Sequence, residues 1–180
     1  GRKRERGGEA GRLVRRRGVS VDRYHVSAGV GVVDEDEILP PYEVTFSGMR
    51  AAEVRERSAQ LGIKRDITRL LTETEYDIVF LPLGKRYYRS IDIDQAVRDI
   101  PEDSIGVVFN RELAGRQYDN IVSVPARTDD AKRHGTIVIG LKGLYLKNLA
   151  NNLDTVDSID PERIAELCRR VETTQTPLTD

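Results

Sequence analysis

The feature that most constrains the fold is the apolar run YDIVFLPL at residues 76–83. A run this continuous is typical of a strand that is covered on both faces, as in the parallel sheets of α/β proteins. Other β-rich segments predict strands near 23–27, 104–110, 120–126 and 135–140. Helical patterns alternate with them at 47–62, 63–73, 92–100, 143–153 and 161–172, with Asp160 and Pro161 starting the last one.

This alternation predicts an α/β fold, a three-layer sandwich around a mostly parallel sheet. Between residues 105 and 140 the expected strands follow one another without helices, which leaves room for an antiparallel hairpin at one edge. By length we expect a single α/β domain at 18–172, a basic flexible arm at 1–17 and a polar tail at 173–180.

Composition narrows the class of protein. The chain has 180 residues, and 33% of them are charged. It lacks an apolar run long enough to span a membrane and the apolar core of a signal peptide. We therefore expect a cytoplasmic protein without membrane contact. Its lone cysteine, Cys168, lies in a helical pattern and is expected to be a small buried residue rather than a nucleophile. We expect no metal, since the chain has only two histidines, and no cofactor.

Charge is distributed unevenly along the chain. Residues 1–17 hold eight basic side chains against two acids, a balance of +6, so the remaining residues carry −7. A basic glycine-rich arm on an acidic body suits contact with nucleic-acid phosphates through Arg15, Arg16 and Arg17. A disordered leader explains the same residues, because the arm has no apolar face.

Three loops that contain glycine, at residues 27–31, 83–89 and 140–143, follow strands or enter helices, where open parallel sheets bind their ligands. Glycines let a ligand approach the backbone, lysines and arginines bind phosphate, and tyrosines can stack on bases. Each segment is also compatible with an ordinary turn. The expected ligand-binding residues are Ser27, Gly29, Tyr42, Gly84, Lys85, Tyr88 and Lys142, with Arg86 and Arg89 as nucleic-acid contacts.

The first of these segments raises the question of catalysis. Residues 24–42, YHVSAGVGVVDEDEILPPY, place a histidine, a hydroxyl and four acids around two glycines. If the protein is an enzyme, Asp34 or Asp36 would activate water or stabilise a cationic sugar, and His25 would assist. A solvated acidic loop and a strand histidine without a catalytic role are the alternatives, and the segment itself is either a tight corner or the lip of a pocket.

The segment HVSAGVGVVDEDEILPPYEVTFSGM resembles the motif LSAKYGLLxPDxxIxPYDxTLxxM of a small uncharacterised family related to the YaaA-like peroxide-stress proteins. YDIVFLPLGKRYYRSI is similar to that family's strand followed by GxxYxxxL, and GLKGLYLKNL to its GxGxxxxWL segment. The resemblance implies an α/β fold loosely akin to uracil-DNA glycosylases and a connection with nucleic acid. Gly29 stands where the family motif has lysine.

Two functions are therefore expected. The first is a nucleic-acid-associated protein with a glycosylase-like base or nucleotide pocket, in stress response or nucleic-acid modification. The second is a non-catalytic binding or assembly module of a larger viral, defence or stress complex, with partner proteins or an N-terminal segment outside this chain. A third, less supported function is an enzyme that acts on free nucleotides. Convergence of Asp34, Tyr42, Lys85 and Lys142 on one pocket would favour an active site, and their dispersal a module.

Overall fold

The protein is built around a three-stranded parallel sheet. The computed structural model describes residues 20–39, 44–111, 118–153 and 160–171. The sheet has the strand order β3-β4-β5, and Phe80 pairs with Val107 and Phe109 with Val124. Its strands are β3 (Ile78–Phe80), β4 (Ile105–Phe109) and β5 (Ile121–Val124).

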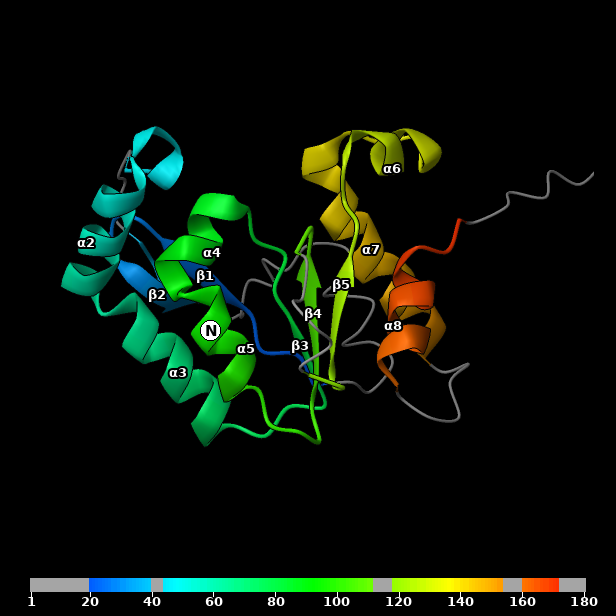
Figure 1. The fold of residues 1–180 in the computed structure, drawn as a ribbon, viewed down its shortest axis with the longest axis horizontal. Coiled ribbons are helices and arrows are strands. Elements are labelled where there is room, and N and C mark those ends of the chain that lie inside the picture. Colours follow the sequence, from blue (N-terminus) through cyan, green and yellow to red (C-terminus); the bar gives the residue numbers. More distant parts are fainter. Residues whose placement is uncertain (1–19, 40–43, 112–117, 154–159, 172–180) are drawn as a thin grey trace, which may run out of the picture.

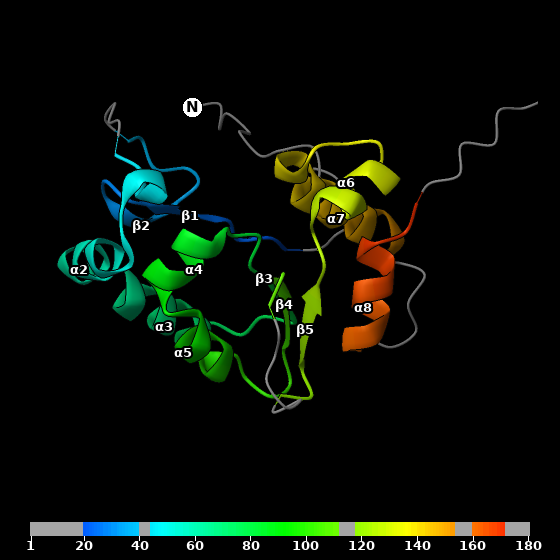
Figure 2. The same cartoon turned by 45° about the horizontal axis from the view of Figure 1, so that its top comes forward.

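Helices cover both faces of this sheet, which gives the three layers seen in Figure 1 and again, after rotation, in Figure 2. One layer consists of α2 (Ala51–Leu61), α3 (Ile63–Glu73), α4 (Lys85–Ile91) and α5 (Ile93–Asp99). The other consists of α6 (Thr128–Arg133), α7 (Val138–Asn152) and α8 (Pro161–Cys168). The expected α/β architecture is confirmed.

The central strand β4 separates two hydrophobic cores. Successive side chains of a strand point to opposite faces, so Val107 and Phe109 pack with α7 and α8 while Val108 packs with α3, α4 and α5. All three are almost fully buried. Gly106 lies on the same face of β4 as Val108. A Cβ at this position would lie only 2.7 Å from Ile100 Cδ1, so the absence of a side chain leaves room for Ile100. A strand with both faces buried explains why its sequence is apolar throughout.

The antiparallel pairing in the described residues lies near the N-terminus. Strands β1 (Tyr24–Ser27) and β2 (Gly31–Asp34) form a separate two-stranded sheet, and Val26 and Val32 pack against the core on the α2–α5 side. Between residues 105 and 140, where sequence left room for a hairpin, β4 and β5 run parallel.

Three expected elements differ from the structure. Residues 138–140 were expected in a strand but begin α7, because Leu141, Tyr145 and Leu149 follow at helical spacing and bury against the sheet. Residues 85–89 and 140–143, expected in loops, belong to α4 and α7. The helix expected from Ser47 begins at Ala51, after the short 3₁₀ helix η1 (Phe46–Gly48). None of the helices in the described ranges is long and apolar enough to cross a lipid bilayer.

Candidate functional site

The glycine turn between β1 and β2 uses its polar groups within the protein. The Oγ of Ser27, which is buried, accepts hydrogen bonds from the backbone N–H groups of Gly29 (3.0 Å) and Val30 (3.2 Å). Arg57 of α2 donates from Nε to the carbonyl of Ala28 (2.9 Å) and from Nη2 to that of Gly29 (3.2 Å). The described part of this segment is therefore a corner fastened to α2.

The expected catalytic residues lie on the outside of the hairpin. His25 is exposed on β1, opposite Val33. Asp34 is exposed at the end of β2, and its Oδ1 accepts a hydrogen bond from the backbone N–H of Asp36 (3.0 Å). Tyr42 and the arm residues Arg15, Arg16 and Arg17 lie outside the described residues.

Tyr88 joins α4 to the sheet. Its hydroxyl donates to the carbonyl of Leu81 (2.7 Å) and accepts from the backbone N–H of Phe109 (2.8 Å). The side chain is only 4% exposed, and burial raises its pKa to about 12. Tyr88 therefore orders the carboxyl ends of β3 and β4, and its ring offers little surface on which a base could stack.

Lys142 connects α7 to the loop that follows β3. Its Nζ donates to the carbonyl of Leu83 and lies 5.4 Å from the centre of the Phe109 ring and 6.0 Å from that of Tyr88. Burial lowers the pKa of this lysine. No ion pair of Lys142 with a carboxylate occurs among the described residues. Its ammonium is held by a carbonyl and two aromatic rings at the carboxyl edge of the sheet.

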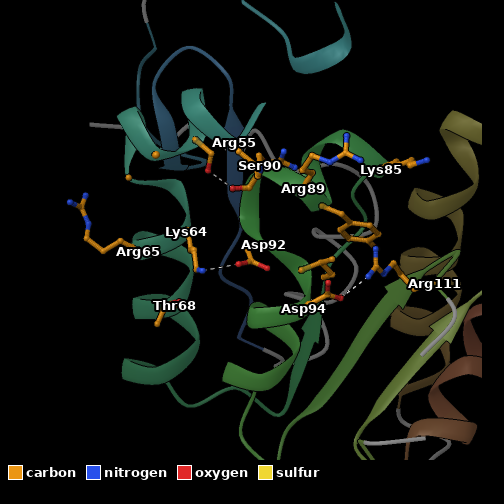
Figure 3. A pocket seen from close by; sticks show the side chains of 15 residues that line it. Arg55, Lys64, Arg65, Thr68, Lys85, Arg89, Ser90, Asp92, Asp94 and Arg111 are labelled. Atoms are coloured by element: carbon orange, nitrogen blue, oxygen red, sulfur yellow. Dashed lines mark hydrogen bonds and ion pairs between the residues drawn. The ribbon is translucent and has the colours of Figure 1, made fainter. Parts of the chain in front are cut away.

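A groove of about 890 Å³ opens between two pairs of helices (Figure 3). α2 and α3 form one wall, α4 and α5 form the other, and Arg111 lies at the end of β4. Six of the lining side chains are basic and two are carboxylates. The basic residues are Arg55, Lys64, Arg65, Lys85, Arg89 and Arg111, and the acids are Asp92 and Asp94.

The charges are arranged differently along the groove. At the end formed by α3 and α5, Lys64 Nζ lies 2.7 Å from Asp92 Oδ2. Arg111 Nη2 lies 2.7 Å from Asp94 Oδ1. The hydrogen bond and the charge of Lys64 together lower the pKa of Asp92. Arg65 pairs with its neighbour Asp66.

At the end formed by α2 and α4, the positive charge is not compensated. Among the described residues, Arg55, Lys85 and Arg89 have no carboxylate partner. In Figure 3 the three residues lie across the upper part of the view, and the Lys85 side chain points away from Arg55. Such a group of uncompensated cations attracts a phosphate-bearing ligand.

Sequence reasoning identified part of this site. Three residues predicted to contact a ligand or nucleic acid, Lys85, Tyr88 and Arg89, line the groove. Asp34 and Lys142 do not line it. Gly84 is exposed as the N-cap residue of α4, and Arg86 lies beside the groove, where its Nε donates to the carbonyl of Met49 (3.3 Å). The charged lining residues that were not anticipated are Arg55, Lys64, Arg65, Asp92, Asp94 and Arg111.

One pattern in the sequence of α2 could have revealed its wall of the groove. Arg55, Ser58, Ala59 and Gly62 stand at i, i+3, i+4 and i+7, which places a cation and small residues on one face. Arg111 has no comparable local signal, because only the packing of β4 beside α5 brings it to the groove.

Comparisons of the chain with protein-family models, curated proteins and solved structures find no match. The resemblance to the YaaA-related family therefore stays a prediction from the quoted motifs. Within the described ranges, no group of three or more histidine, cysteine, aspartate or glutamate residues could hold a metal ion.

Proposed function

We propose that the protein binds nucleic acid through the phosphate backbone, at the α2–α4 end of the groove, as a binding module. The observation that carries this proposal is the group formed by Arg55, Lys85 and Arg89, three cations without carboxylate partners in the described structure around one concave surface. Arginine and lysine in such a group bind successive phosphates and release their counterions.

Binding rather than catalysis is supported by where the expected catalytic residues lie. His25, Asp34 and Asp36 are exposed on the hairpin, and none of them lines the groove. Tyr88 lines the groove but is buried, so the contacts available to a ligand are mainly ionic. Recognition of the backbone by charge is independent of base sequence.

Affinity for a fluorescent oligonucleotide, measured by anisotropy across a series of salt concentrations, tests the proposal. Three phosphate contacts predict that the logarithm of the association constant falls with the logarithm of salt concentration at a slope of about 2 to 3. Arg89→Gln is expected to reduce that slope by about 0.7–0.9 and to weaken binding at low salt.

Arg169→Gln is the matched control, because it makes the same charge change at the exposed end of α8, in the opposite helical layer. Equal effects of the two substitutions would contradict a role for the groove. Competition by polyglutamate as effective as competition by DNA would contradict phosphate recognition, since the cations would then be binding carboxylates.

A further inference from the structure

The groove carries two carboxylates at its α3–α5 end, away from Arg55, Lys85 and Arg89. Asp92 joins α4 to α5, and Asp94 lies in the first turn of α5. Each holds one cation of the groove at 2.7 Å, Lys64 in one pair and Arg111 in the other (Figure 3). The cations that remain without such a partner lie at the other end.

A phosphate at the α3–α5 end would meet two obstacles. It would approach two negative charges, and it would have to displace carboxylates that already occupy Lys64 and Arg111. At the α2–α4 end, Arg55, Lys85 and Arg89 need no such displacement among the described residues. Like charges placed along a binding surface are a common way of excluding a ligand from part of it.

We propose that Asp92 and Asp94 are specificity-determining residues, which confine phosphate binding to the α2–α4 end of the groove. The ligand that fits this arrangement is a short run of about three phosphates, such as the end of a strand or a short oligonucleotide, rather than a long stretch of backbone. This inference rests on the proposed nucleic-acid binding.

Asparagine is a suitable replacement at both positions. Asp92 has a φ of 53°, a left-handed conformation that asparagine adopts readily. Its side chain caps α5 by accepting a hydrogen bond from the backbone N–H of Gln95 (3.4 Å), and an asparagine oxygen can accept the same bond. Asp94 is 72% exposed, so its replacement does not disturb packing.

The experiment measures the salt dependence of binding for single-stranded oligonucleotides from about three to about twenty nucleotides long, a range that brackets a site of about three phosphates. The slope is the diagnostic quantity, because a longer strand raises apparent affinity simply by offering more binding positions. For the unmodified protein we expect the slope to stop increasing once the strand supplies about three phosphates.

Asp92→Asn removes the carboxylate partner of Lys64, and Asp94→Asn removes that of Arg111. Each is therefore expected to strengthen binding of the longer strands and to increase the slope by about 0.7. Asp103→Asn is the matched control. It removes the same charge from an exposed residue at the opposite end of β4 from Arg111, and is expected to leave the slope unchanged.

Failure of this inference and failure of the proposed function give different results. If the unmodified protein binds with a slope that rises in step with strand length, and the asparagine variants behave like Asp103→Asn, the confinement by Asp92 and Asp94 is overturned while nucleic-acid binding stands. If no strand of any length binds in a salt-dependent manner, the proposed function is overturned together with the inference.

Discussion

The turn between β1 and β2 requires a residue without a side chain at Gly31. Its φ is +93°, and a Cβ at this position would lie 3.2 Å from the carbonyl oxygen of Leu61. Both the backbone conformation and the contact with α2 disfavour any larger residue. Gly31→Ala is therefore expected to lower the free energy of unfolding by about 1–3 kcal/mol, measured by urea denaturation.

Gly143→Ala provides the control for that substitution. Gly143 lies within α7, and a Cβ there would meet no atom within 4 Å. Since alanine favours a helix more than glycine does, this change is expected to be neutral or to stabilise the protein by about 1 kcal/mol. A Gly31→Ala protein as stable as the Gly143→Ala protein would contradict the requirement for glycine in the turn.

Single residues also show how far chemistry can be predicted from residue type. Lys85 and Arg89 were expected to bind a ligand, and both line the groove. Ser27 and Tyr88 were also expected to bind a ligand; the hydroxyl groups of both make hydrogen bonds to backbone groups, and Tyr88 also lines the groove. Cys168 is buried as expected, and burial raises its pKa to about 12. The sequence indicates what a side chain can do, but its partners decide what it does.

At the scale of elements, the pair between Lys64 and Asp92 links α3 to the junction of α4 and α5. The hydrogen bond from Lys64 lowers the pKa of Asp92 below 3.8 in the folded protein. The stabilisation is therefore complete above pH 3.8 and is lost as the pH falls through the lower, folded pKa. Because both side chains are partly exposed, we expect a contribution of at most about 1 kcal/mol.

Comparison with Asp92→Asn isolates this contribution. The difference in free energy of unfolding between the two proteins, from urea titrations, is expected to be largest near neutral pH. It should shrink as the pH falls through the lowered pKa of Asp92 in the folded chain, because protonation removes the charge that pairs with Lys64. A difference that stays constant over this range would show that the ion pair contributes nothing to stability.

The elements differ in how well local sequence specifies them. An apolar stripe predicted α3, and three of its members are buried while the fourth, Leu70, is half-buried. The buried members are Ile63, Ile67 and Leu71. Asp160 caps α8 as expected, accepting from the backbone N–H of Arg163 (2.9 Å). The strand expected at 135–140 is wrong for residues 138–140. Their β-branched side chains favour a strand, but burial of the next turns of α7 against the sheet makes these residues helical.

At the scale of the whole molecule, β4 is shared by the two hydrophobic cores. Val107 belongs to the core on the α7–α8 side, and its neighbour Val108 to the core on the α2–α5 side. Val107→Ala is expected to cost about 2 kcal/mol through lost burial. Because both cores need β4, we expect hydrogen exchange at the most protected amides of α3 and α7 to accelerate by the same factor.

Val108→Ala tests the same coupling from the other face and is expected to give the same equal acceleration. If each substitution accelerated exchange only in the helices that contact it, the two cores would be opening as separate units. That result would contradict cooperative unfolding through the shared strand.

The sequence by itself determined the features that depend on interactions within a few residues or on repeated patterns of burial. The apolar run at 76–83 specified β3 with both faces covered, a second apolar segment specified β4, and the capping residue Asp160 specified where α8 begins. From their alternation the three-layer α/β fold followed.

Only the tertiary structure decided where a candidate site lies. Arg55, Arg89 and Arg111 come from α2, α4 and the end of β4, and no local pattern relates them. Hydrophobic burial fixes the positions of these elements, and the polar side chains on their outer faces are brought together as a consequence. The same packing used Ser27 and Tyr88 in internal hydrogen bonds, and it left Arg55, Lys85 and Arg89 without a carboxylate partner among the described residues.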